Sequence, residues 1–491
     1  MGNKQADWAA VPDIASAVSL VEAAVVVGDE SPPTLAAARF LCAETTTAAP
    51  AVKRLAWSAL TQSRRAEEHA DPDAHHFIRY YKSRLRENPR DAVSWIDVAR
   101  LYSSLGQNLK AEEAISYAVR LRPDDRFVVR SAVRFFVHIE QPDIAHSLLV
   151  RCSATKHDPW LNAAEIASAS LRGKAPRYVK SARNFLESSR DAPRDLTELA
   201  GALATIELEN GKAIQARKLF KFSLKDPNDN ALAQARWAAD NHKIGTVDSL
   251  LIESVPKSYE AATWQAFKEG SWDTAFAQSE FWAKDEPFSS GPACHASFLA
   301  ISLLGRYEEG ERIAKTGLVA NPHEFTLKNN LLVAYAYQNR IEEASALFSQ
   351  MNWSEGDEIH RLAALGLISA RRGDIEESLS NYLGAIGLAT EKKDYTASGR
   401  AAFHLLKEMI AWDPSSSERV LRLADHVLSK VKNPELESYR HMVKSGTNIS
   451  LNPNVQQSLD SAQRASLVGT ISEALEDGIK KYLNTTLSPV G

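Results

Sequence analysis

Imidazole and carboxylate side chains gather in one short segment near the start of the chain, and together they suit a divalent metal ion. The segment contains Glu67, Glu68, His69, Asp71, Asp73, His75 and His76. It also has a simpler interpretation, because Asp71-Pro72-Asp73 is typical of a turn followed by a helix N-terminus. On such a helix the adjacent histidines His75 and His76 would point about 100° apart. We therefore favour a structural role and predict no metal site.

Short motifs that carry common catalytic chemistry are missing from the sequence. It has no glycine-rich phosphate loop of the Gly-x4-Gly-Lys-Ser/Thr or Gly-x-Gly-x-x-Gly kind, and no Gly-x-Ser-x-Gly turn. His323-Glu324 begins like the helix of a zinc protease, but Leu327 stands where the second histidine ligand is needed. We therefore predict a protein that is not an enzyme and binds no cofactor.

Aromatic side chains are dense between residues 264 and 288. They could form a stacking surface for bases or proline-rich peptides, or they could fill the seam between packed helices. Most of them lie at helical spacing, which favours the seam. Trp272 is the least easily buried, because it lies in a Gly-Ser-Trp turn.

Composition and charge indicate a folded chain from a reducing compartment. The 491 residues are 44% hydrophobic and 24% charged, and a net charge of -4 argues against wholesale coating of nucleic acid. Cys42, Cys152 and Cys294 lie more than 100 residues apart, which favours isolated thiols over disulfides. The longest apolar run, residues 14–27, is too short to span a bilayer. We expect a cytoplasmic protein that does not associate with membranes.

Small and aromatic residues recur at regular intervals between residues 92 and 123. The small residues would let two antiparallel helices approach, and the aromatic residues would fill the seam between them. Gly106 suits the end of the first helix and Pro123 the end of the second. The pattern comprises Trp95, Ala99, Tyr102, Gly106, Ala111, Ile115, Ala118 and Pro123. It closely resembles the tetratricopeptide repeat, a helix-turn-helix unit of about 34 residues.

Similar spacing recurs along most of the chain. The clearest later copies cover residues 270–287, 305–322, 335–348 and 366–385. The resemblance implies an all-α fold, a right-handed solenoid of stacked helix-turn-helix repeats with helical caps at both ends. Each repeat buries only one face of its helix pair, so stability depends on stacking against neighbours.

The same pattern divides the chain into five parts. Residues 240–258 interrupt the repeat frame with Gly, Thr, Ser and Pro, and form either a joint between two solenoids or a longer turn, which we favour. The predicted parts are an N-terminal cap with a degenerate repeat (1–88), N-terminal repeats (89–239), the irregular connection (240–258), C-terminal repeats (259–412) and a C-terminal helical cap (413–491).

In the tetratricopeptide family, ligands usually lie in a concave groove lined by the first helix of each repeat. The resemblance therefore implies which residues of this chain line such a groove. In the first two clear repeats they include Val93, Ile96, Arg100, Phe127, Arg130, Arg134 and His138, and in later repeats Asn329, Val333, Tyr337, Ala363, Leu367, Ala370 and Arg371. As partner-binding residues we predict Ile96, Arg100, Phe127, Arg130, Arg134, Asn329, Val333 and Tyr337.

The charge of the predicted groove differs between its two halves. Residues 53–136 contain 16 Lys and Arg against 11 Asp and Glu, a balance of +5. Because arginine binds carboxylates bidentately, this half favours an acidic segment of a partner protein, with a merely solvated basic face as the alternative. The later lining is more apolar and would suit an amphipathic helix or a second copy of the chain.

The sequence thus favours an interaction scaffold or regulatory subunit that binds segments of partner proteins. The alternative is a helical-repeat nucleic-acid-binding protein, with Arg100, Arg130 and Arg134 on phosphates. Binding of that kind would weaken steeply with added salt.

Overall fold

The computed structural model describes residues 2–27, 31–43, 47–49, 52–53, 55–56, 74–188, 192–412, 421–422, 425 and 433–445. The chain divides into two compact units, Met1–Glu87 and Asn88–Gly491. All regular elements of the described residues are helices. None of these described helices is both long enough and apolar enough to cross a lipid bilayer.

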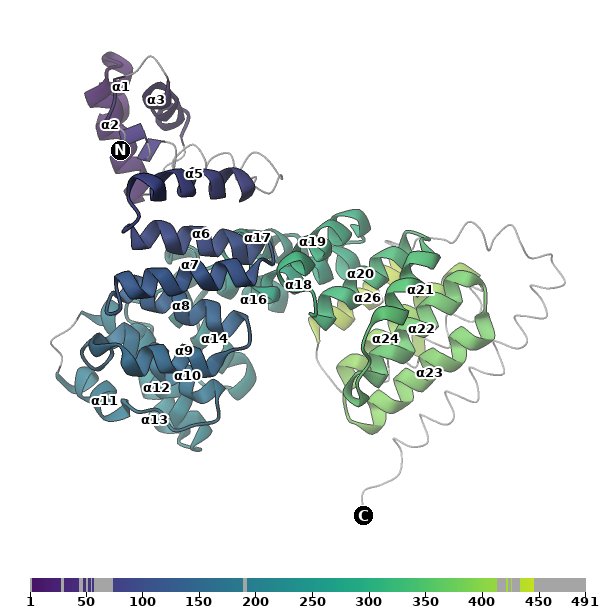
Figure 1. The fold of residues 1–491 in the computed structure, drawn as a ribbon. Helices are drawn as coiled ribbons and strands as arrows, with labels where there is room; N and C mark the ends of the chain where they lie inside the picture. Colours follow the sequence, from purple (N-terminus) through teal and green to yellow (C-terminus); the bar gives the residue numbers. More distant parts are fainter. Residues whose placement is uncertain are drawn as a thin grey trace. The chain divides into compact units, whose positions relative to one another are not determined.

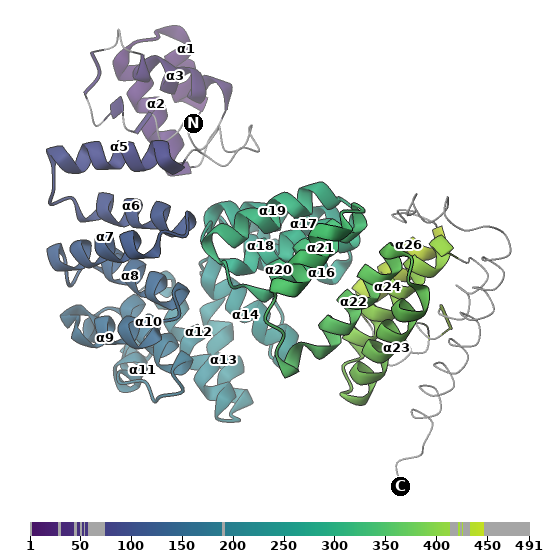
Figure 2. The same ribbon diagram turned by 45° about the vertical axis from the view of Figure 1, so that its right-hand side comes forward.

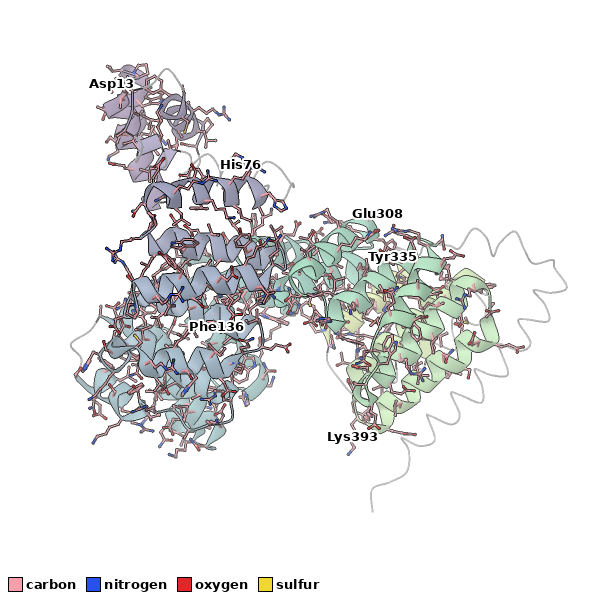
Figure 3. All side chains as sticks on the ribbon, in the orientation of Figure 1. Asp13, His76, Phe136, Glu308, Tyr335 and Lys393 are labelled. Carbon is pink, nitrogen blue, oxygen red and sulfur yellow. The ribbon has the colours of Figure 1, made fainter. Side chains whose placement is uncertain are left out.

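Unit 1 contains the helices α1 (Gly2–Ala10), α2 (Ile14–Val27), α3 (Pro32–Cys42) and α5 (Ala74–Glu87). Helices α1, α2 and α3 pack on one another, with Leu20, Val21 and Leu41 fully buried between them. Asp13, labelled in Figure 3, accepts a hydrogen bond from the backbone N–H of Ser16 at 2.7 Å, which caps α2.

Unit 2 is a succession of helix pairs that runs through most of the chain (Figure 1). The first five pairs are α6 (Ala92–Ser104) and α7 (Asn108–Leu121), α8 (Arg126–His138) and α9 (Pro142–Arg151), α10 (Pro159–Leu171) and α11 (Val179–Ser188), α12 (Pro193–Glu209) and α13 (Ala213–Ser223), and α14 (Asp229–His242) and α15 (Ser249–Ser254). The next four are α16 (Tyr259–Glu269) and α17 (Trp272–Asp285), α18 (Ser290–Phe298), which η2 (Leu299–Leu303) extends, and α19 (Tyr307–Ala320), α20 (Phe325–Tyr337) and α21 (Ile341–Gln350), and α22 (Glu358–Arg372) and α23 (Ile375–Glu391). Helices α24 (Tyr395–Trp412) and α26 (Pro434–Ser445) follow, and the short helices η1 (Ser153–His157) and η3 (Glu355–Asp357) precede α10 and α22.

The turn inside a helix pair usually contains a residue in the left-handed conformation. Gly106 has φ +67° at the end of α6, and Glu140, 34 positions later, has φ +58° at the end of α8. Gly305 (φ +66°) and Asn339 (φ +59°) repeat the same interval further on. A left-handed residue reverses the chain after a helix, so the regular spacing of these turns produces the repeat.

Acidic residues begin several of the first helices. Asp91, Asp125 and Asp158 each accept hydrogen bonds from backbone N–H groups in the first turn of α6, α8 and α10. These carboxylates satisfy donors that the helix itself leaves unpaired. Each pair therefore starts at a side-chain cap and reverses at a left-handed turn.

Buried side chains join the pairs into one stack. On α8, Phe136 is 4% exposed (Figure 3), and on α23 Tyr382 is 1% exposed against Gly366 of α22. A Cβ atom at Gly366 would lie 2.7 Å from the Tyr382 ring, so only glycine allows this approach. The predicted fold class is thus confirmed: unit 2 is an all-α solenoid of tetratricopeptide-like repeats.

Residues 240–258 contain the short helix α15 and continue the stack. Ile244 is buried against Phe220 and Ala235, and Ile252 is buried against Leu232 and Ala261. Helices α14 and α16 also contact each other directly. The segment therefore takes the place of a second helix between two neighbouring first helices.

Candidate partner-binding face

The first helices of successive pairs lie next to one another and share a surface, which we call the first-helix face. Contacts join α6 to α8, α8 to α10, α10 to α12, α12 to α14 and α14 to α16, and further on α18 to α20, α20 to α22 and α22 to α24 (Figure 2). All eight predicted partner-binding residues lie on these first helices. Their role in binding remains a prediction.

Arg130 of α8 binds a carboxylate of the same unit. Its Nη2 atom donates to both oxygens of Glu198 on α12, at 3.0 and 2.7 Å. The guanidinium carbon also lies 5.2 Å from the ring centroid of Trp160. Glu198 accepts a further hydrogen bond from Asn228 at 2.6 Å. This arginine is thus held between an aromatic ring and an acid that the chain itself supplies.

Arg134 and Arg100 contact the turn that follows α17. Arg134 forms an ion pair with Glu286 and lies 5.8 Å from the Phe288 ring centroid. Nη2 of Arg100 donates to the backbone carbonyl oxygen of Asp285 at 2.6 Å. The three predicted arginines therefore all have acceptors within unit 2, and an acidic partner segment would have to compete with them.

Two acidic side chains, Glu286 and Glu260, lie near Arg134. Burial, together with the nearby charges of Glu286 and Asp229, raises the pKa of Glu260 on α16 to about 7, against the opposing effect of Arg134. Burial also raises the pKa of Asp229, at the start of α14. Helical spacing alone does not reveal these acids, because they come from repeats distant along the chain.

Large apolar side chains are exposed on the N-terminal part of the first-helix face. Val93 and Phe127, at equivalent positions of α6 and α8, are both 50% exposed, and Trp237 of α14 is 45% exposed. Ile96, by contrast, is buried. Trp237 was not among the predicted residues, although it occupies the same helical position in α14 that Arg100 and Arg134 occupy in α6 and α8.

The C-terminal part of the first-helix face is largely covered. Asn329 and Val333 are half-buried, and Tyr337 is buried with its hydroxyl 2.7 Å from Nδ1 of His404 on α24. Leu367 and Ala370, which we expected in an exposed apolar strip, are also buried. The face that the sequence predicted to be open is therefore covered in this half of the solenoid.

A buried polar cluster lies beneath this cover. Arg371 Nη2 donates to Glu408 Oε1 at 2.8 Å, and both side chains are only 1% exposed. Lys407 Nζ lies 4.2 Å from the ring centroid of Tyr337. Burial lowers the pKa of Lys407 to about 8, with Arg371 lowering it and Glu408 raising it. Burial likewise lowers the pKa of His404 to about 3. The cluster mixes charges and aromatic rings where the sequence suggested apolar contacts.

The other sequence candidates have the following positions. His75 and His76 lie on α5, whereas residues 57–73 lie outside the described residues. Within the described part of the chain, no group of three or more His, Cys, Asp or Glu side chains is arranged to hold a metal ion. Trp272 is half-buried, and its indole Nε1 donates to Ser438 Oγ on α26 at 2.8 Å.

Several solved structures are similar to this chain, at low sequence identity. The crystal structure of yeast Tom70 has 13% sequence identity and a TM-score of 0.28, and the match covers 81% of this chain and 96% of that one. The tetratricopeptide domain of P58(IPK) has 14% identity and a TM-score of 0.23, with 81% and 100% covered. The structure of Naa15/Naa10 bound to HypK-THB has 12% identity and a TM-score of 0.26, with 96% and 88% covered.

No protein-family model matches the sequence, and no curated protein is similar to it. The resemblance to tetratricopeptide repeats therefore rests on the helix pairs, their period and their packing in unit 2.

Proposed function

We propose that this protein is a non-catalytic interaction scaffold, acting as a regulatory subunit in the cytoplasm, whose first-helix face binds segments of partner proteins. The observation that supports this most directly is the combination of exposed Phe127 and Trp237 with the arginines of α6 and α8. Tryptophan and arginine are the residue types most enriched among the energetic centres of protein interfaces. The free thiols of Cys42, Cys152 and Cys294 are compatible with a reducing compartment.

The arginines have a specific part in this proposal. Because Glu198 and Glu286 already hold Arg130 and Arg134, an acidic partner segment would exchange one carboxylate for another. Such an exchange adds little affinity by itself, and it fixes the register of the bound segment. The affinity would come from apolar contacts with Val93, Phe127 and Trp237.

The experiment places a photo-crosslinking amino acid at single positions of the full chain in cells. At Phe127 and at Trp237 we expect crosslinks to the same partner protein. Leu109 of α7 and Ile214 of α13 are matched controls, because they are 80% and 67% exposed on second helices. Crosslinks of equal yield and identity at all four positions would contradict binding on the first-helix face.

The same material distinguishes the nucleic-acid alternative. Contacts of Arg100, Arg130 and Arg134 with phosphates would give crosslinks to RNA or DNA in lysates of the same cells. Their yield would fall steeply between about 50 and 200 mM salt, with a logarithmic slope set by the number of phosphates bound. We expect a protein crosslink whose yield changes little over that range.

A further inference from the structure

Helix α26 lies against the first-helix face of the C-terminal repeats. It packs on α24, which precedes it, and also on α16 and η2, which belong to much earlier pairs (Figures 1 and 2). These three elements are first helices or the extension of one. A single helix of the chain therefore lies across first helices from both ends of this half of the solenoid, α16 and the extension of α18 on one side and α24 on the other.

The polar contacts of α26 are specific. Glu435 is 1% exposed and accepts two hydrogen bonds from Arg400 of α24, from Nε at 2.6 Å and from Nη2 at 2.7 Å. The guanidinium group of Arg400 also lies 5.2 Å from the ring centroid of Phe298 on α18. A fork of this geometry recognises a carboxylate by position as well as by charge.

The apolar contacts come from the same side of α26. Leu436 is fully buried against Gly399, where a Cβ atom would lie only 2.6 Å from Leu436 Cδ1. Tyr439 is 2% exposed, with its ring centroid 5.9 Å from that of Phe403 and 6.0 Å from that of His404.

The covering residues have helical spacing. Glu435, Leu436 and Tyr439 occupy positions i, i+1 and i+4, so they project from one side of the helix. Ser438 at i+3 accepts the hydrogen bond from Trp272, while Glu437 on the other side is exposed. This is the arrangement by which an amphipathic helix is bound in the groove of a partner.

We infer that α26 is a tethered occupant of the first-helix face, and that the partner of this half is an amphipathic helix with the same pattern, Glu-Leu-x-x-Tyr. The inference rests on the proposed function, because it assigns a class of ligand to the same face. Residues 413–433 connect α24 to α26. Because α26 belongs to the same chain as the face, its binding there is intramolecular, so a partner helix must displace it.

The test uses a fluorescent peptide of residues 433–445 and the full chain. The double variant Leu436→Asp with Tyr439→Ala weakens the tethered helix and leaves α16, α18 and α24 unchanged. We expect the peptide to bind this variant at least about 10-fold more tightly than it binds the wild-type chain. Equal affinity for the two chains, with equal helix content by circular dichroism, would overturn the inference.

A charge exchange identifies the contact. Adding Arg400→Glu to the double variant should reduce binding of the natural peptide about 10-fold or more, and a peptide with Glu435→Arg should restore it. Failure of the exchanged peptide to bind would place the peptide elsewhere on the chain and contradict the assignment.

Hydrogen exchange on the wild-type chain gives a result that depends on no variant. If α26 is a displaceable occupant, its amide protons exchange at least about 10-fold faster than those of α24, because the helix leaves the face without unfolding the repeats. Exchange of α26 only together with α24 would show that it is an integral part of the core.

These outcomes are separate from those of the crosslinking experiment. Peptide binding by the double variant, without protein crosslinks at Phe127 and Trp237, would contradict the proposed function and leave the inference on α26 intact. Protein crosslinks at Phe127 and Trp237, without peptide binding by the double variant, would contradict the inference on α26 and leave the proposed function intact.

Discussion

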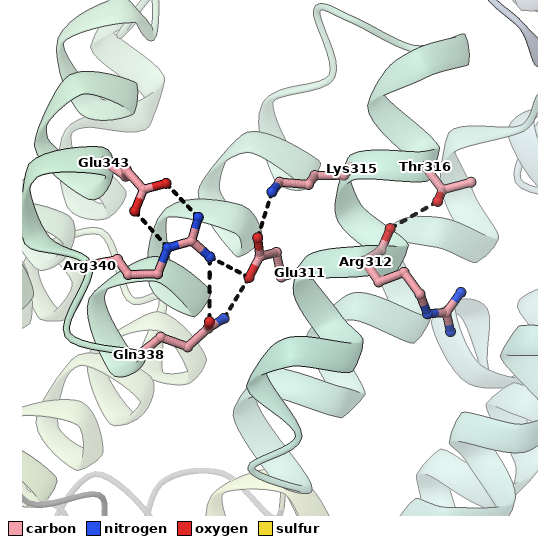
Figure 4. A network of polar contacts seen from close by, with 7 residues as sticks. All are labelled: Glu311, Arg312, Lys315, Thr316, Gln338, Arg340 and Glu343. Carbon is pink, nitrogen blue, oxygen red and sulfur yellow. Dashed lines mark hydrogen bonds and ion pairs between the residues drawn. The ribbon is translucent and has the colours of Figure 1, made fainter.

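At the scale of single residues, Glu311 shows how a surface carboxylate connects neighbouring helix pairs. It lies on α19 and accepts hydrogen bonds from Lys315 of the same helix, and from Gln338 and Arg340 in the turn before α21 (Figure 4). Glu343 of α21 holds Arg340 from its other side. Partial burial alone would raise the pKa of Glu311, but these hydrogen bonds lower it to about 2.

We predict that Glu311→Gln destabilises the protein in a pH-dependent way. The folded pKa of about 2 lies below the ordinary glutamate pKa of 4.5. The stabilisation is therefore present above about pH 4.5 and is lost as the pH falls towards 2. At pH 7 the variant should lose about 1–3 kcal/mol of unfolding free energy, and roughly half as much or less at pH 3.

Chemical denaturation at the two pH values measures this loss. Glu308→Gln on the same helix is the control, because Glu308 is exposed (Figure 3). We expect that substitution to change the unfolding free energy by less than about 0.5 kcal/mol. A loss of the same size for both substitutions would show that the hydrogen bonds of Glu311 do not cause the destabilisation.

At the scale of secondary-structure elements, the left-handed turns decide where each pair reverses. Gly106 and Gly211 have nearly the same backbone conformation, with φ of +67° and +73°. Their surroundings differ, because a Cβ at Gly106 would collide with the backbone carbonyl oxygen of Val319 on α19, whereas nothing lies within 4 Å of one at Gly211.

We predict that Gly106→Ala costs clearly more stability than Gly211→Ala. The conformational cost of a left-handed alanine is about 1 kcal/mol at both positions. The collision with a backbone atom should raise the loss at Gly106 to about 2–4 kcal/mol, because the backbone of α19 must move. Thermal unfolding of the two variants provides the comparison, and equal midpoints would show that α6 and α19 do not touch in solution.

At the scale of the whole of unit 2, contacts between distant repeats hold its first pairs against later ones. Arg134 binds Glu286, Arg100 binds the carbonyl of Asp285, and α6 contacts α19. The exposure of Arg134 limits the ion pair to about 1 kcal/mol or less. The ion pair nevertheless affects the arrangement of the repeats, because it joins the second helix pair to the turn after α17, several pairs further along the stack.

We predict that Arg134→Glu increases the radius of gyration measured by small-angle X-ray scattering. Repulsion from Glu286 would separate the first pairs from the turn after α17. The combined change Arg134→Glu with Glu286→Arg should restore the original value. Arg122→Glu is the control, since Arg122 pairs with Asp125 within its own turn. An unchanged radius in the single variant would show that this ion pair does not hold the repeats together.

The sequence by itself determined the repeat. Trp95, Ala99, Tyr102 and Gly106 predicted a helix pair because local chain reversal and close packing of two neighbouring helices need particular residue types at fixed spacing. Glu140 adopts the same left-handed turn without glycine or asparagine, so its position follows from the period and not from residue type.

Only the tertiary structure decided how the candidate site is used. Helical spacing placed Arg130, Arg134 and Tyr337 on first helices, but their partners Glu198, Glu286 and His404 come from other repeats. The sequence predicted a C-terminal helical cap, but not the surface on which α26 packs, because its contacts join residues as distant as Trp272 and Ser438. Local propensity and period act over a few turns of helix, whereas the exposure of a face depends on how many repeats stack and which distant segment returns to it.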